Sequence, residues 1–120
     1  MQFKHIGLPV KDIKAAERFY DAIASSVHLE KIDTHDDFVG YGEDGSYEFY
    51  LHTGRDAVCG LHICFGVVTK EEVDAFHRAA VEAGAKDNGA PGIRADYAEN
   101  YYAAFVIDPD GNNIEAVCLT

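Results

Sequence analysis

The chain has 120 residues, 48% of them hydrophobic and 26% charged, a composition that indicates one folded domain and excludes a disordered chain. Its 21 acidic and 10 basic residues give a net charge of -11, which disfavours binding to nucleic acid or to anionic membranes and leaves a small molecule as the expected partner. No apolar run resembles a signal peptide or a membrane span, and three cysteines without a CxxC pair favour a reducing compartment, so we expect a cytoplasmic protein.

The first half of the chain predicts one strand, one helix and three further strands. Residues 3–10 form an apolar run typical of a strand. Asp12 then caps a helix over about 13–25, whose apolar residues recur at helical spacing. The three remaining strands are expected near residues 28–34, 37–42 and 46–53.

The second half repeats this order after a linker at residues 53–56. A strand is expected over 58–67, followed by a helix over 70–83 that Thr69 and Glu72 begin as a capping box. The glycine-rich segment that follows predicts a short strand and then a surface loop, at 85–88 and 88–97. Two last strands, 101–107 and 112–119, are joined by the turn Asp-Pro-Asp-Gly.

The two halves begin alike. His5 and His62 each open a short apolar run, and each run reaches a helix cap seven residues later, at Asp12 or Thr69. We therefore predict an α+β fold of two tandem βαβββ modules within a single domain, module 1 over about 1–53 and module 2 over about 58–120. The doubling brings the two histidines to equivalent places, and Glu115 in the last strand adds a carboxylate, so the three form a candidate divalent-metal set.

The segments starting at His5 (His-Ile-Gly-Leu-Pro-Val), Leu61-His62-Ile63 and residues 108–115 (Asp-Pro-Asp-Gly-Asn-Asn-Ile-Glu) resemble the vicinal-oxygen-chelate superfamily over nearly the whole chain. That superfamily includes glyoxalase I, bleomycin- and fosfomycin-resistance proteins and extradiol dioxygenases. The resemblance implies that the sheets of the paired modules curl into an open cup with a metal at its floor. It also implies a homodimer, since open modules leave edge strands that association can cover.

The resemblance places metal ligands at His5, His62 and Glu115, with Glu115 also catalytic. Two histidines and a carboxylate suit Fe(II), Mn, Ni or Zn. Tyr50 aligns with the fourth ligand of glyoxalase I, a glutamate, and a register shift of two would put Glu48 or His52 there instead. A phenol, whose pKa is about 10, is a poor metal ligand, so we do not expect true glyoxalase I activity. Tyr50 is a candidate catalytic residue that donates a hydrogen bond to a substrate oxygen.

Candidate substrate-binding residues complete the predicted site; they are Arg94, Tyr102, His52 and Glu48. Arg94 is one of few positive charges and anchors an anionic group or, alternatively, forms a surface salt bridge. The leading function is a metalloenzyme (lyase, isomerase or dioxygenase) acting on a small oxygenated organic molecule. The alternatives are a metal-free protein that binds or sequesters a small molecule, as bleomycin-resistance proteins do, and a structural or regulatory protein.

Overall fold

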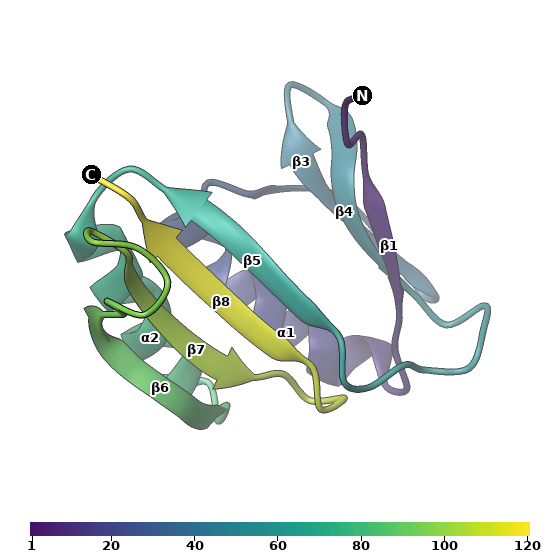
Figure 1. Cartoon of the computed structure of the whole chain (residues 1–120). Helices are drawn as coiled ribbons and strands as arrows, with labels where there is room; N and C mark the ends of the chain where they lie inside the picture. The colour runs from purple at the N-terminus through teal and green to yellow at the C-terminus, as the bar shows by residue number, and fades with distance from the viewer.

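Two four-stranded sheets lie side by side in the structure, a computed structural model of residues 1–120 (Figure 1). The first sheet has the strand order β1-β4-β3-β2 and the second β5-β8-β7-β6. The first and fourth strands of each module in chain order are neighbours and run parallel, β1 with β4 and β5 with β8. The remaining pairs are antiparallel. The predicted α+β fold of two βαβββ modules is thereby confirmed.

The first sheet and its helix are built from residues 6–52 and the second from 62–118. The elements of the first are β1 (Ile6–Pro9), α1 (Ile13–Ala24), the short 3-10 helix η1 (Ser25–Val27), β2 (Glu30–His35), β3 (Phe38–Glu43) and β4 (Ser46–His52). The elements of the second are β5 (His62–Val67), α2 (Lys70–Glu82), β6 (Lys86–Ile93), β7 (Tyr102–Ile107) and β8 (Asn113–Cys118). Neither helix is long and apolar enough to cross a membrane.

Both helices pack against one side of the sheets, α1 on the first and α2 on the second, and they also contact each other (Figure 1). The main apolar core, of 19 buried residues, runs through both modules. Strand side chains alternate between faces, so each strand gives about half of its residues to this core. The other half points to the opposite, open face of its sheet, which is where residues that bind a ligand can lie.

The turn between β7 and β8 fastens the two modules together. The buried Asp108 carboxylate accepts hydrogen bonds from the Tyr20 hydroxyl of α1 at 2.6 Å and from the backbone N–H of Asn112 at 2.9 Å. The Asn112 side chain in turn accepts from the backbone N–H of Leu61 and donates to the carbonyl of Val58 in the linker. These bonds fix the start of β5, and therefore His62, relative to the end of β7.

Two sequence predictions fail in this half of the fold, and the first is the start of the strand expected over 58–67, which begins only at His62. The segment 89–93, predicted as loop, continues β6 as an edge strand. The pairing register with β7 shifts on either side of Gly89. Because of these irregularities, the segment lacks the alternation of apolar and polar residues that would indicate a strand. Pro91 is compatible with this strand because an edge strand does not need every N–H for pairing. The loop begins only after Ile93.

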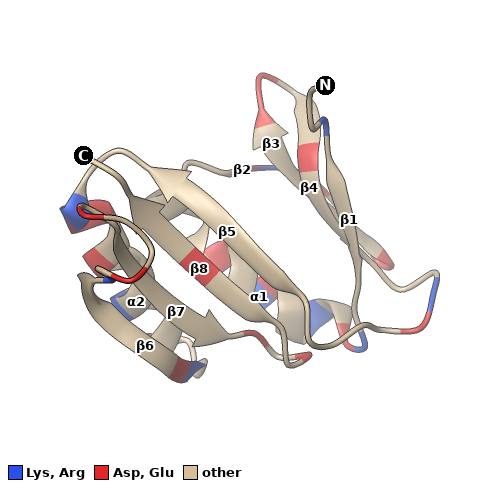
Figure 2. Ribbon diagram, viewed as in Figure 1, with Lys and Arg blue, Asp and Glu red and all other residues tan.

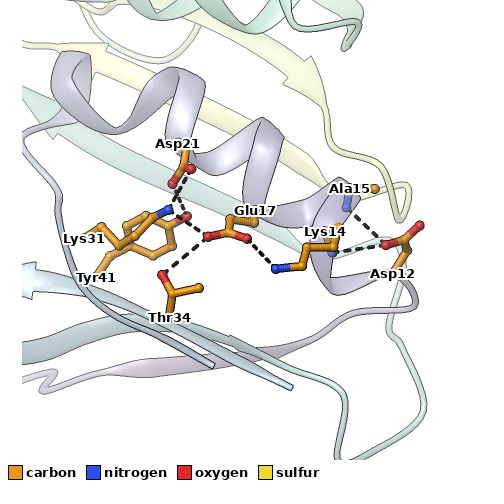
Figure 3. Close-up of polar contacts among 8 residues, drawn as sticks. All are labelled: Asp12, Lys14, Ala15, Glu17, Asp21, Lys31, Thr34 and Tyr41. Atoms are coloured by element: carbon orange, nitrogen blue, oxygen red, sulfur yellow. Dashed lines mark hydrogen bonds and ion pairs between the residues drawn. The ribbon is translucent and has the colours of Figure 1, made fainter. Parts of the chain in front are cut away.

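A polar network holds α1 against the first sheet (Figure 3). The Lys31 ammonium group of β2 lies 2.7 Å from a Glu17 oxygen and 2.8 Å from an Asp21 oxygen, and the Tyr41 hydroxyl donates to Asp21. The hydrogen bond from Lys31 lowers the pKa of the Glu17 carboxyl, and the bonds to Asp21 and Glu17 raise the pKa of Lys31. The stabilisation from Glu17 is therefore present above its ordinary pKa of 4.5 and is lost as the pH falls through its lowered value.

We predict that Lys31→Met lowers the free energy of unfolding by about 1 kcal/mol near neutral pH, because it removes two ion pairs at once. Lys14→Met is the matched control, since Lys14 is largely exposed and reaches Glu17 only at 3.7 Å. Urea unfolding near pH 7 and again near pH 3 measures both variants. The Lys31→Met deficit should shrink at the lower pH as the Glu17 carboxyl protonates, and a deficit equal to that of Lys14→Met at neutral pH would contradict the assignment.

Candidate metal and ligand site

A carboxylate is buried in the open face of the second sheet. Glu115 is 1% exposed, and it is the single acidic residue of β8, seen as the red band in that strand in Figure 2. One carboxylate oxygen lies 2.7 Å from Nε2 of His62, and the other accepts a hydrogen bond from the Tyr101 hydroxyl at 2.5 Å. Burial of an unpaired carboxylate is costly, so these two partners are what keep Glu115 in place.

The strand register explains why these side chains meet. β5 runs parallel to β8 with Cys64 opposite Glu115, so His62 and Cys64 share the open face with the carboxylate. On the other side of β8, Phe105 of β7 is also paired with Glu115, and Tyr101 precedes that strand. The His62 side chain remains 53% exposed. The site therefore has a buried acid at its base and an imidazole that a ligand can reach.

Glu115 affects the protonation of its neighbours. Burial and the hydrogen bond to Glu115 raise the pKa of the Tyr101 hydroxyl, which thus remains a proton donor at neutral pH. Partial burial and the negative charge of Glu115 raise the pKa of the Cys64 thiol to about 12. A thiol with that pKa is almost entirely protonated near pH 7, so Cys64 is a weak nucleophile despite its exposure to solvent.

The first sheet carries an equivalent but different arrangement. Gly7 is paired with Tyr50 as Cys64 is paired with Glu115, so Tyr50 occupies the place that the carboxylate has in the second sheet. The Tyr50 ring lies over Gly7, where a Cβ atom would come within 2.3 Å of it. The ring centroid is 5.9 Å from that of His5 and 5.7 Å from that of His52. The open face of this sheet is thus aromatic where the second sheet has an acid.

Of the predicted metal ligands, the structure brings His62 and Glu115 into contact and leaves His5 beside Tyr50 in the other sheet. No group of three or more His, Cys, Asp or Glu side chains in the chain is arranged to hold a metal ion. A groove of about 410 Å³ separates β5 from β1 and β4, and its lining includes His62 from one sheet and Glu48 from the other. The donors of the two sheets thus border one groove.

Two predicted substrate-binding residues lie on opposite faces of the second sheet. The Tyr102 side chain points to the helix side, where its hydroxyl donates to Asp74 of α2 at 2.6 Å, which does not fit a role in the open face. Arg94 follows β6 and lies over Phe105 on the open face, with its guanidinium carbon 5.2 Å from the ring centroid. It takes part in no ion pair, so the alternative of a surface salt bridge for Arg94 does not hold.

Tyr101 is the residue of this site that sequence analysis did not single out. The candidate substrate-binding residues predicted from the sequence include its neighbour Tyr102 instead. Strand alternation puts Tyr101 on the same face of the sheet as Phe105. The turn after Ile107 pairs Phe105 with Glu115, so Tyr101 also lies on the face of the carboxylate. The choice between the adjacent tyrosines needed this register.

The paired βαβββ sheets, with an acid and a histidine on one open face, are found in one known superfamily. The chain belongs to the Glyoxalase/Bleomycin resistance protein/Dioxygenase superfamily, whose sequence profile matches residues 2–116. No protein of curated function is significantly similar to it in sequence.

Solved structures share the fold across the whole chain. A glyoxalase/bleomycin resistance protein from Albidiferax ferrireducens T118 is 28% identical, with a TM-score of 0.84 over 97% of this chain and 98% of that one. A glyoxalase/bleomycin resistance protein/dioxygenase family enzyme from Burkholderia phytofirmans PsJN is 20% identical, with a TM-score of 0.75 over 100% of both chains. A lactoylglutathione lyase from Agrobacterium tumefaciens is 21% identical, with a TM-score of 0.68 over 97% of this chain and 92% of that one.

The charge on Glu115 should suppress the reactivity of Cys64. We predict that Glu115→Gln speeds alkylation of Cys64 by iodoacetamide near pH 8 by about tenfold, because a pKa that falls by one unit gives ten times more thiolate. Peptide mass spectrometry follows each cysteine separately, with the exposed Cys59 as internal reference. Tyr101→Phe, which keeps the carboxylate charge, should not accelerate the reaction. Equal rates in the wild type and Glu115→Gln would contradict the electrostatic cause.

Proposed function

We propose that this protein is a metal-dependent enzyme that acts on a small oxygenated organic molecule bound against the open sheet faces, with His5, His62 and Glu115 as metal ligands. The observation that carries the proposal is the contact between the buried Glu115 carboxylate and the accessible His62 imidazole. Imidazole and carboxylate are the donors that Fe(II), Mn, Ni and Zn bind in proteins. The three free cysteines are compatible with action in the cytoplasm.

The chemistry of the donors fits a divalent ion, although two of them are too few to hold one firmly. When bound, such an ion would polarise a carbonyl or enediolate oxygen of the substrate, which supports lyase, isomerase or dioxygenase reactions. The Tyr101 hydroxyl occupies one oxygen of Glu115 and orients the other toward His62. Tyr101 thus has the role of a positioning residue for the ligand set.

We place the complete ligand set between two copies of the chain in a homodimer. β1 and β5 are each an outer strand of their sheet, and each has an edge without a pairing partner. His5 directly precedes β1 and His62 begins β5, so the donors of both sheets lie at edges that a second copy can approach. His5 of one copy would then join His62 and Glu115 of the other.

We do not propose a reaction of the glyoxalase I type, because of the residues of the first sheet. That reaction needs a second carboxylate, and the pairing of Gly7 with Tyr50 puts a phenol where Glu115 stands in the second sheet. The Tyr50 hydroxyl is proposed to donate a hydrogen bond to a substrate oxygen, with Glu48 and His52 beside it on the same strand. Glu115 remains the candidate catalytic carboxylate.

A metal-free binding protein is the second candidate. It is favoured by a row of aromatic rings on the open face of the first sheet, where Phe38 stacks on Tyr50 at 5.4 Å and meets Tyr47 at 5.4 Å. Together with the net charge of -11, such a row suits a planar cationic compound. In that case the chain would sequester its ligand without converting it.

Metal content separates the two candidates. We predict that untagged protein, loaded anaerobically and dialysed, retains about one equivalent per chain of Fe(II), Mn, Ni or Zn, as expected for a site of three protein ligands. His62→Ala and His5→Ala should each lose the ion and keep the fold, as judged by circular dichroism. His77→Ala is the matched control, because His77 pairs with Asp87 on the helix side. Retention of far less than one equivalent of all four metals would reject the enzyme proposal.

A further inference from the structure

Arg94 is held in one place by the strand that precedes it. Its two terminal nitrogens donate to the carbonyl of Gly92 at 2.9 Å and to that of Ala90 at 2.7 Å. An added Cβ at Gly89 would lie 3.1 Å from the guanidinium, and one at Gly92 would lie 3.2 Å from it. The glycines of β6 therefore leave the space that the guanidinium occupies. The Arg94 side chain is already fixed in one conformation, so a ligand that binds it does not have to order it.

The charge of this guanidinium is not neutralised within the chain. Among 21 acidic residues, none lies within ion-pair distance of Arg94, whereas Lys31 has two carboxylate partners. An arginine has five N–H donors and is always charged in proteins, so at least three donors remain after the two carbonyls are satisfied. A partly buried, fixed arginine with free donors is suited to a planar anion such as a carboxylate.

The guanidinium also belongs to the same open face as the proposed metal ligands. It lies over Phe105, and the Phe105 ring centroid is 6.2 Å from that of His62. Phe105 is in turn the residue paired with Glu115 across β7 and β8. One aromatic ring thus neighbours both the free positive charge and the histidine–carboxylate pair.

We propose that the substrate is a small monocarboxylic acid whose carboxylate binds Arg94 and whose other oxygens reach the accessible His62 imidazole beside Glu115. The inference rests on the proposed function, because it names the class of molecule that occupies that site. A negative field of -11 charges repels anions in general, so selective binding of a carboxylate depends on this local charge.

Two catechols that differ by one carboxylate test the assignment. Calorimetric titration of the zinc-loaded protein with 3,4-dihydroxybenzoate and with catechol should give about tenfold tighter binding of the carboxylate, the gain expected from a charge-assisted pair. Arg94→Gln should lower the affinity for 3,4-dihydroxybenzoate to that for catechol. Arg55→Gln, which removes the same charge from the linker, should leave the preference intact.

The outcomes distinguish the inference from the function on which it rests. If the wild type binds both compounds equally, or if Arg94→Gln keeps the preference, the carboxylate assignment is wrong while the proposed metal and ligand site stands. If the wild type binds neither compound, the carboxylate assignment is wrong, and the zinc content of the same sample shows whether the proposed metal site stands. If both Arg94→Gln and Arg55→Gln lose the preference for 3,4-dihydroxybenzoate, the preference comes from the net charge of the protein. That result would also reject the role of Arg94.

Discussion

The burial of Glu115 is the constraint on which the site depends. A carboxylate with 1% exposure is tolerated only with hydrogen-bonding partners, and here these are His62 on one oxygen and Tyr101 on the other. Its charge holds the imidazole and the phenol in position, and burial together with this charge raises the pKa of the neighbouring Cys64 thiol. The same carboxylate thus organises the open face of the second sheet, and we propose it as a donor for a metal ion.

Duplication explains both the symmetry and the asymmetry of the molecule. The two sheets have the same strand order and the same parallel pairing, so equivalent residues occupy equivalent positions. Tyr50 and Glu115 are such a pair, one a phenol over Gly7 and the other a carboxylate beside Cys64. One sheet has thus become an aromatic surface while the other holds the acid, and the groove between the sheets is lined by Glu48 of the first and His62 of the second.

Most of the fold could be predicted from sequence because its signals are local. The caps at Asp12 and Thr69 are seen in the structure, and the helices they begin end within one residue of the expected positions. The strand at 89–93 was missed because glycine bulges erase alternation. Within the site, alternation places Glu115 on the open face, but the choice of Tyr101 over Tyr102 depended on the pairing of β7 with β8. No local pattern encodes whether His5 meets His62, a contact that we propose to form between two copies of the chain.

Complementation between two inactive variants tests most directly whether the site is shared between two copies. His5→Ala and His62→Ala are each expected to bind no metal, and mixing them after partial unfolding and refolding produces mixed dimers. In a mixed dimer one of the two sites regains both histidines, so the mixture should recover about a quarter of the wild-type metal content if the pairing is symmetric. Recovery of none, with light scattering showing dimers of twice 13.2 kDa, would contradict the account, because each site would then belong to a single chain.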